Sequence, residues 1–143
     1  MSDARDLLAA YPATAIERLR ALRLVVVDVD GVLTDGRITL GDDGTEYKAF
    51  HTHDGHGLRM LQDNGVGVGI ITGRSSAIVH RRAHELGIAH LLQGRRDKAA
   101  ALDEMAAESG QPREAMAYVG DDVVDLAAMN AAGSGVAVAN APA

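Results

Sequence analysis

Two aspartates stand at the end of an apolar run near the start of the chain. Residues 24–36 read LVVVDVDGVLTDG, so Asp28 and Asp30 come directly after four aliphatic residues. Such a run is typical of a strand buried on both faces, where an unpaired carboxylate is costly because desolvation disfavours its charged form. The pair therefore indicates a binding or catalytic site, and the simpler alternative is an Asp turn at the strand end.

Polar residues also follow later apolar runs. Thr72-Gly73-Arg74 follows the second run, Lys98 comes after the third, and Gly120-Asp121-Asp122 follows the fourth. In an open α/β sheet, ligands bind beyond the carboxyl ends of the strands. We therefore expect these groups and the first two aspartates to meet at one crevice.

Carboxylates gathered in this way repel one another, which predicts a cation among them. The sequence has no cysteine and no clean histidine triad, so oxygen ligands predominate and favour Mg²⁺. Lys98 and the hydroxyl of Thr72 would suit an anionic group on the substrate. A phosphoryl group fits, because its transfer depends largely on positioning and charge neutralisation.

The elements that would position these residues alternate between strands and helices. This alternation predicts βαβ units and a mostly parallel sheet. The expected strands are Leu24–Val29, Val66–Ile71, His90–Gln93, Ala117–Val119 and Val136–Ala139, and the expected helices are Gly57–Asn64, Ser75–Leu86, Asp97–Ser109 and Asp122–Ala131.

Two segments depart from this alternation. Residues 1–22 read as helical, with a break near Tyr11-Pro12. Residues 36–51 predict an antiparallel β-hairpin, with arms at Arg37–Leu40 and Thr45–Phe50 around a Gly/Asp-rich turn. The hairpin is either a solvated ornament at the edge or a flap or interface beside the site.

Length and composition narrow the classes of function. The 143 residues suit one domain, 1–143. A net charge of −6 and an aromatic content of 3% disfavour a nucleic-acid-binding surface. Neither a membrane-spanning run nor a secretory signal is visible, so we expect no membrane partner and a cytoplasmic protein.

Four motifs in order resemble the haloacid dehalogenase superfamily of phosphotransferases: D-x-D-G-V-x-T-D-G, T-G-R, Lys, and G-D-D-x-x-D. The likeness runs from about Leu24 to Asn140. More narrowly, DVDGVLTDG, KAF, DGHGLRML, IITGRSS, LGIAHLLQG and AYVGDDVVDLAAM resemble the cap-less 3-deoxy-D-manno-octulosonate 8-phosphate phosphatases and their nonulosonate 9-phosphate relatives. The resemblance implies a Rossmann-like three-layer α/β sandwich with a protruding hairpin and no cap domain.

The resemblance also implies catalytic roles. Asp28 would be the nucleophile that forms an aspartyl-phosphate, and Asp30 would protonate the leaving alkoxide and then take a proton from water. Thr72 and the Gly73 backbone would hold phosphoryl oxygens, while Lys98 balances their charge.

For the metal, the resemblance implies that the Asp28 side chain, the Asp30 carbonyl and the Asp121 side chain bind Mg²⁺, with Asp122 and Asp125 as supporting acids. The candidate residues for binding the phosphorylated sugar-acid substrate are Thr72, Gly73, Arg74, Lys98 and His53.

This chain departs from the family pattern at two places. His51 and His53 stand where the octulosonate phosphatases carry asparagine and arginine, which leaves octulosonate 8-phosphate and nonulosonate 9-phosphate both open as substrates. The former would belong to lipopolysaccharide precursor synthesis and the latter to a sialic-acid-like pathway. The chain also stops at Ala143, where family members continue with a short strand and a helix.

Other kinds of protein fit less well. A signalling receiver domain also gathers aspartates, a threonine and a lysine, but it places its acidic pair first in the sequence rather than last. A catalytically idle scaffold with this fold remains a further alternative. The resemblance implies a homotetramer with hairpins at the shared interface.

Overall fold

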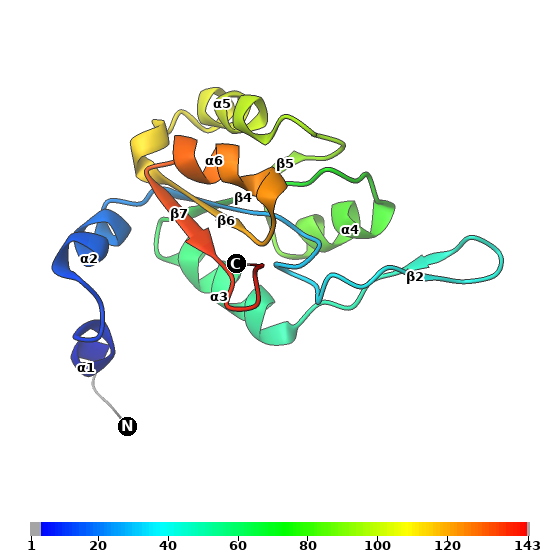
Figure 1. Cartoon of the computed structure of the whole chain (residues 1–143), viewed down its shortest axis with the longest axis horizontal. Helices are drawn as coiled ribbons and strands as arrows, with labels where there is room; N and C mark the ends of the chain where they lie inside the picture. The colour runs from blue at the N-terminus through cyan, green and yellow to red at the C-terminus, as the bar shows by residue number, and fades with distance from the viewer. Residues whose placement is uncertain (1–3, 143) are drawn as a thin grey trace.

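A five-stranded parallel sheet forms the centre of the computed structural model, which describes residues 4–142 (Figure 1). The strand order is β5-β4-β1-β6-β7. β1 lies in the middle and pairs in parallel with β4 on one side and β6 on the other. The strands are β1 (Leu24–Val27), β4 (Gly67–Ile71), β5 (His90–Leu92), β6 (Met116–Gly120) and β7 (Ser134–Ala137).

Helices cover both faces of the sheet (Figure 1). Successive residues of β1 serve opposite faces, because side chains alternate along a strand. Val26 belongs to one core cluster with Leu102 of α5, whereas Val27 belongs to the other with Leu58 of α3 and Val79 of α4. Burial on both faces explains why this strand is apolar throughout. The four helices are α3 (Thr52–Asp63), α4 (Ala77–Glu85), α5 (Lys98–Ser109) and α6 (Leu126–Ala131).

The N-terminal segment consists of α1 (Ala4–Leu8) and α2 (Ala13–Arg20). Pro12 is the residue before α2, so the predicted break near Tyr11-Pro12 is present. In Figure 1 the two helices lie to one side of the sheet. Across residues 4–142, no helix has both the length and the apolar character needed to cross a bilayer.

The predicted hairpin projects from the body of the molecule (Figure 1). Its strands β2 (Thr39–Leu40) and β3 (Glu46–Tyr47) pair antiparallel, and both are shorter than the predicted arms. The part of the structure between Asp30 and Thr72 holds only this hairpin, α3 and β4. The predicted α/β fold, with a mostly parallel sheet, a protruding hairpin and no cap domain, is confirmed.

Helix α3 begins five residues earlier than the predicted Gly57. His51 explains the difference, because it is the N-cap residue and its Nδ1 accepts a hydrogen bond from the backbone N–H of His53 at 3.1 Å. His53 and His56 therefore lie on a helix rather than on the hairpin. The predicted hairpin segment, residues 36–51, therefore ends at His51, the N-cap residue of α3.

The region after β6 also differs from the prediction. The expected helix Asp122–Ala131 is divided into a 3₁₀ turn, η2 (Val123–Asp125), and α6. The turn forms because Asp122 and Asp125 cap each other's backbone N–H groups. β7 lies two residues before the predicted Val136–Ala139, and a second 3₁₀ turn, η1 (Arg113–Ala115), precedes β6.

Candidate active site

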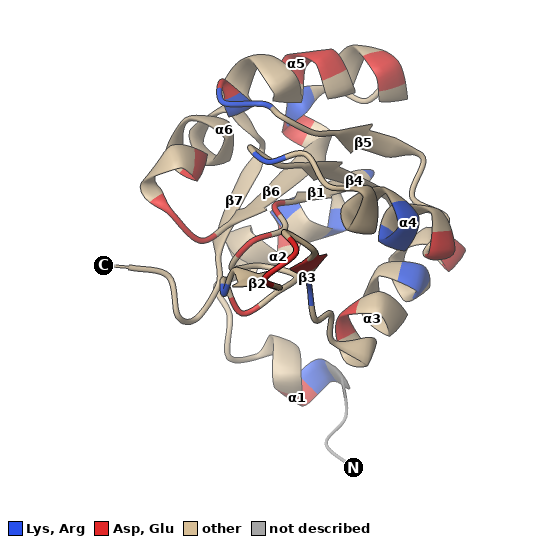
Figure 2. Ribbon diagram, turned by 90° about the vertical axis from the view of Figure 1, so that its right-hand side faces the viewer, with Lys and Arg blue, Asp and Glu red and all other residues tan. Residues whose placement is uncertain are grey.

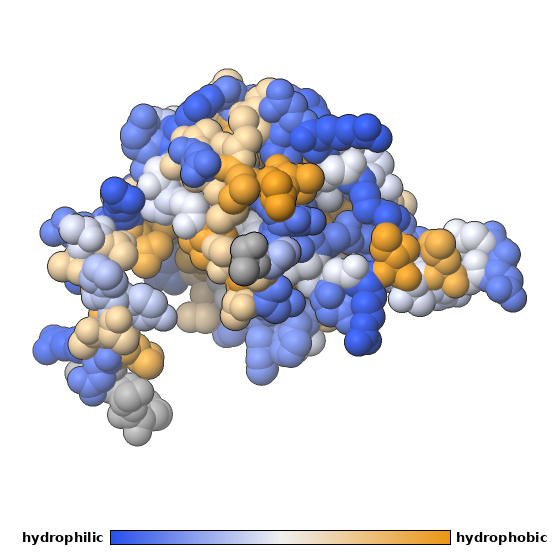
Figure 3. All heavy atoms as spheres, viewed as in Figure 1, coloured by the Kyte–Doolittle hydropathy of each residue, from blue (hydrophilic) through white to orange (hydrophobic). Residues whose placement is uncertain are grey.

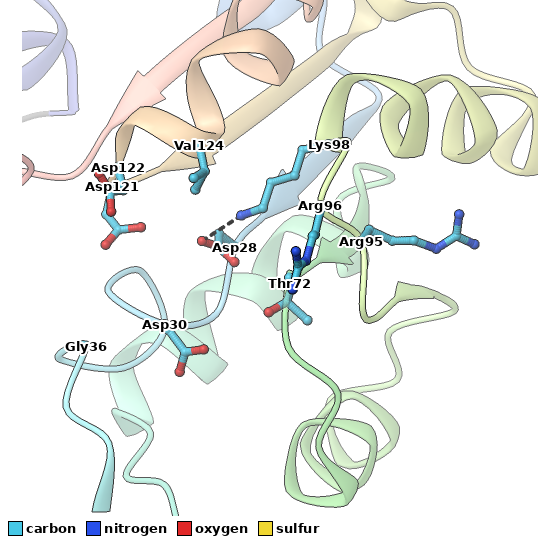
Figure 4. Close-up of a pocket in the computed structure, with 11 residues that line it drawn as sticks. Asp28, Asp30, Gly36, Thr72, Arg95, Arg96, Lys98, Asp121, Asp122 and Val124 are labelled. Carbon is cyan, nitrogen blue, oxygen red and sulfur yellow. Dashed lines mark ion pairs between the residues drawn. The ribbon is translucent and has the colours of Figure 1, made fainter.

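A cavity of about 520 Å³ lies at the carboxyl ends of the central strands (Figure 4). The loops after β1, β4 and β6 and the loop before α5 supply its walls, as expected for an open α/β sheet. Figure 2, which faces the side from which the hairpin projects, shows acidic and basic segments intermingled there. The cavity is lined by Asp28, Asp30, Gly36, Thr72, Gly73, Arg95, Arg96, Lys98, Asp121, Asp122 and Val124.

Asp28 lies at the floor of the cavity and is only 5% exposed. One carboxylate oxygen accepts a hydrogen bond from the backbone N–H of Val29 at 2.7 Å, and the other lies 3.0 Å from Lys98 Nζ. Burial raises the pKa of Asp28 to about 6, although Lys98 and the Val29 N–H act in the opposite direction. The lysine therefore compensates only part of the cost of burying this charge.

Lys98 joins Asp28 to a second buried carboxylate. Its Nζ lies 2.6 Å from Asp125 Oδ1, which also accepts a hydrogen bond from the hydroxyl of Tyr118 at 2.9 Å. Asp125 Oδ2 accepts from the backbone N–H groups of Asp121 and Asp122. Burial alone would raise the pKa of Asp125, but these hydrogen bonds and the charge of Lys98 lower it.

The donor set suits a divalent cation bound by oxygen. Asp28, Asp121 and Asp125 each offer a carboxylate oxygen within 4.8 Å of the others. Burial and the neighbouring charges of Asp125 and Asp122 raise the pKa of Asp121, so a cation there would relieve the repulsion. Asp125 is fully buried and already accepts four hydrogen bonds, whereas Asp28 and Asp121 line the cavity, so these two side chains are better placed to bind Mg²⁺.

Thr72 and Asp30 face the same cavity from two different loops. Thr72 is 2% exposed, and its hydroxyl points into the cavity in Figure 4. Gly73 follows it on the wall. The Asp30 carboxylate lies away from the pair formed by Asp28 and Lys98, toward the hairpin (Figure 4). The structure therefore brings together the predicted residues Asp28, Asp30, Thr72, Gly73, Lys98, Asp121, Asp122 and Asp125.

Two predicted substrate-binding residues lie outside the cavity wall. Arg74 Nη2 is 3.3 Å from Glu46 Oε1 on the hairpin, and Arg74 Nε is 3.9 Å from Asp30 Oδ2. His53 lies in the first turn of α3, and its ring centroid is 4.7 Å from that of His51. Direct contact of Arg74 and His53 with substrate stays a prediction.

Sequence reasoning assigned no role to two residues of this region. Lys48 contacts Asp30, and Tyr118 donates a hydrogen bond to Asp125. A signal for Lys48 was present, because Glu46 and Lys48 alternate along a strand and so share a face. Tyr118 stood inside a predicted strand, where an aromatic residue is ordinary core.

Comparison with known proteins places this site in a family. A profile of the haloacid dehalogenase-like hydrolases matches residues 42–133. The chain is 45% identical over 126 residues to the 3-deoxy-D-manno-octulosonate 8-phosphate phosphatase of Yersinia pestis, covering 88% of this chain and 67% of that protein. The chain belongs to the haloacid dehalogenase-like hydrolase family. The corresponding phosphatase of Escherichia coli strain K12 is 43% identical over 90% of this chain and 69% of its own length.

Solved structures of this phosphatase family agree in fold. The Moraxella catarrhalis octulosonate 8-phosphate phosphatase, in complex with magnesium, phosphate and the sugar acid, superposes with a TM-score of 0.89 at 44% identity. The match covers 92% of this chain and 76% of that one. A cobalt-bound relative from Haemophilus influenzae gives a TM-score of 0.85 at 42% identity, over 87% of this chain and 73% of that one. The predicted family and phosphatase class are confirmed.

Proposed function

We propose that this protein is a Mg²⁺-dependent phosphomonoesterase that hydrolyses 3-deoxy-D-manno-octulosonate 8-phosphate. The observation that carries this proposal is the likeness to the Moraxella catarrhalis phosphatase, which holds magnesium, phosphate and the sugar acid. The cavity supports it chemically, since Asp28, Lys98 and Asp121 meet where a phosphoryl group needs a nucleophile, a positive charge and metal ligands.

In the first half of the reaction, an Asp28 oxygen attacks phosphorus and forms an aspartyl-phosphate. The bond from phosphorus to the sugar oxygen breaks, and Asp30 gives a proton to that oxygen. Thr72 and the Gly73 backbone N–H hold the phosphoryl oxygens, while Lys98 Nζ balances charge from 3.0 Å behind Asp28.

In the second half, Asp30 takes a proton from a water molecule that attacks the phosphorus. The bond from phosphorus to Asp28 breaks, and phosphate leaves. Mg²⁺, bound by the side chains of Asp28 and Asp121 and by the Asp30 carbonyl, would neutralise the charge of the phosphoryl group. Asp122 and Asp125 support this arrangement by holding the loop that carries Asp121.

The identity of the sugar acid is the part of the proposal that most needs a test. Octulosonate 8-phosphate and a nonulosonate 9-phosphate both carry a carboxylate and a terminal phosphate. The family resemblance implies that His53 replaces an arginine suited to a carboxylate, and Arg96 offers a guanidinium on the cavity wall instead.

The experiment is to measure kcat/KM with Mg²⁺ on the two sugar-acid phosphates and on nitrophenyl phosphate. We expect octulosonate 8-phosphate to give the highest value. A higher kcat/KM for the nonulosonate ester would indicate that the protein acts in the sialic-acid-like pathway instead. If the folded protein turned over none of the three esters, the proposed phosphatase activity would be refuted. A catalytically idle scaffold with this fold would then be the remaining interpretation.

The oligomeric state and the hairpin flap belong to the same proposal. We infer a homotetramer of single-domain chains, 1–143, in which residues 36–51 take the place of a cap. Hydrophobic side chains on the hairpin support it: Ile38, Leu40 and Tyr47 are each more than half exposed. Figure 3 shows hydrophobic atoms on the surface of the projecting hairpin. A monomeric mass by light scattering, together with full activity, would contradict this part.

The setting of the reaction follows from its substrate. A phosphorylated sugar acid carries several negative charges and does not cross a bilayer unaided. The proposal therefore places the enzyme in the cytoplasm, in the synthesis of the lipopolysaccharide precursor.

A further inference from the structure

Lys48 is a buried cation at the base of the hairpin. Its side chain is 2% exposed, and its Nζ lies 2.8 Å from Asp30 Oδ1 and 3.0 Å from Glu46 Oε1. Burying an ammonium group is costly unless it is paired on more than one side. Two carboxylates within hydrogen-bond distance meet that requirement and fix where the lysine lies.

Arg74 closes the arrangement from the opposite side. Its Nη2 lies 3.3 Å from the same Glu46 oxygen, and its Nε is 3.9 Å from Asp30 Oδ2. Two cations and two carboxylates thus connect three segments of the chain: the loop after β1, the hairpin and the loop after β4. Of these four residues, only Asp30 lines the cavity.

The two oxygens of Asp30 are held unequally. Oδ1 is at hydrogen-bond distance from Lys48, whereas the Arg74 contact to Oδ2 at 3.9 Å is too long for a hydrogen bond. An aspartate without such an anchor can turn about its last side-chain bond, because that torsion is broad. The Lys48 contact therefore engages Oδ1 and leaves Oδ2 as the oxygen free to take part in proton transfer.

We propose that Lys48 is a positioning residue, which holds Asp30 Oδ1 so that Oδ2 exchanges protons with the leaving group and with water. This inference rests on the proposed function, since it assigns Asp30 the proton transfers. Lys48 acts through Asp30 and does not itself contact substrate, because its side chain is shielded and lies outside the cavity wall.

The proposed step is balanced without a further reactant. When the bond from phosphorus to the sugar oxygen breaks, the proton on Oδ2 moves to that oxygen. Asp30 is then ionised and receives a proton from the water that attacks the aspartyl-phosphate. Lys48 keeps its three protons throughout and contributes geometry only.

The dependence on leaving group distinguishes positioning from a general structural role. A sugar alkoxide is a poor leaving group that needs a proton, whereas nitrophenolate leaves readily without one. For Lys48→Met we therefore expect kcat/KM to fall roughly tenfold on octulosonate 8-phosphate but by less than about threefold on nitrophenyl phosphate. Lys48→Arg, which keeps the cation, should restore part of the loss.

Arg81→Met is the matched control. It removes one positive charge from the surface of α4, where Arg81 Nε lies 3.3 Å from Glu85 Oε1. Its kcat/KM on both esters should stay within about twofold of the parent protein. An equal loss in Arg81→Met and Lys48→Met would assign the effect to net charge and overturn the proposal.

A double-mutant cycle with Asp30→Asn gives the decisive result. If Lys48 acts only through Asp30, Lys48→Met should change kcat/KM by less than about twofold in the Asp30→Asn background. The proposal would be overturned if the losses in kcat/KM of the two single variants multiplied in the double variant. It would also be overturned if Lys48→Met lowered kcat/KM equally on both esters. If Lys48→Met does not fold, Glu46→Gln replaces it in the cycle, because it removes the other partner of the lysine.

Failure of this inference can be told apart from failure of the proposed function. Absence of phosphate release by the parent protein refutes the phosphatase itself. Turnover by the parent protein with an unchanged ratio between the two esters in Lys48→Met refutes only the role of Lys48.

Discussion

Two lysines of this protein have nearly the same surroundings but belong to very different parts of the fold. Lys98 has a side chain 4% exposed and lies between Asp28 and Asp125, at 3.0 and 2.6 Å. Lys48 has a side chain 2% exposed and lies between Asp30 and Glu46, at 2.8 and 3.0 Å. The first holds the predicted nucleophile, and the second holds the predicted acid and base.

The two lysines differ in what surrounds their partners. Asp125, in the turn after β6, is fully buried, and Asp28, after β1, is nearly so. The side chains of Asp30 and Glu46 are 24% and 22% exposed and lie on a loop and a hairpin. The proposed nucleophile thus lies in buried surroundings at the end of the central strand, whereas the proposed proton-transfer group lies on a loop that contacts the hairpin.

The largest effect is expected at the end of β1. Asp28→Asn removes the proposed nucleophile while keeping its size, so kcat should fall by at least about 10⁴-fold. The measurement is phosphate release, with circular dichroism to check the fold. Retained activity would show that the nucleophile is assigned to the wrong residue.

Stability should separate the two lysines. Lys98→Met leaves two buried carboxylates without their cation, which should lower the free energy of unfolding by about 3–5 kcal/mol. Lys48→Met leaves partners that water can reach, so its loss should be about 1 kcal/mol. Urea denaturation of the metal-free variants at pH 7 tests this difference. Equal losses would mean that the hairpin is as rigid a support as the sheet.

Two glycines with the same backbone conformation provide a smaller contrast. Gly31 beside the site and Gly44 at the hairpin tip have φ of +86° and +82°. A Cβ at Gly31 would overlap Asp121 Oδ2, whereas one at Gly44 would meet nothing within 4 Å. Gly31→Ala should therefore lower kcat/KM by about 10²-fold.

Gly44→Ala should cost only the strain of its backbone, about 1 kcal/mol of stability, with kcat unchanged. Steady-state kinetics and thermal unfolding of the two variants give both quantities. If Gly31→Ala kept full activity, the close approach of Gly31 to Asp121 would have no catalytic importance.

The smallest effect concerns the titration of Asp28 in the metal-free protein. Burial raises its pKa to about 6, against about 3.9 for an unfolded chain. The folded state thus binds this proton more tightly, so the contribution of Asp28 to stability falls as pH rises from about 4 to about 6 and is constant above.

Carboxyl ¹³C NMR of the metal-free protein should locate this titration. Lys98→Met should raise the pKa of Asp28 further, since it removes the nearest positive charge, while Lys48→Met should leave that pKa unchanged. Added Mg²⁺ should lower it. A titration of Asp28 that responds to Lys48 would contradict the separation between the two clusters.

The sequence predicts the cluster of Lys98 with Asp28 and Asp125 much better than the cluster of Lys48 with Asp30 and Glu46. Asp28, Thr72, Lys98 and Asp121 follow predicted strands or begin a helix, and parallel strands bring such positions to one edge whatever the details of packing. The mostly parallel sheet and its helix layers follow from the same alternation, whereas the strand order was not predicted. The part of the site that lies at the ends of the strands could therefore be predicted from the sequence pattern alone.

The hairpin contacts depend on how one segment lies against another, which no local pattern records. The contact between the Arg74 guanidinium and Glu46 on the hairpin was not predicted, and the binding of substrate by Arg74 stays a prediction. The start of α3 was missed because Gly55 and Gly57 lower helix propensity, while the cap at His51 compensates in the folded chain. The ion pair between Lys48 and Asp30 is likewise a tertiary contact, which local sequence patterns do not predict.

One measurement tests the central claim most directly: phosphate release from octulosonate 8-phosphate by the purified protein, with Mg²⁺ and after its removal by EDTA. The account predicts rapid release with Mg²⁺, loss of release with EDTA, and its return when Mg²⁺ is added again in excess. Release that is unaffected by EDTA, or no release under either condition from folded protein, would contradict it.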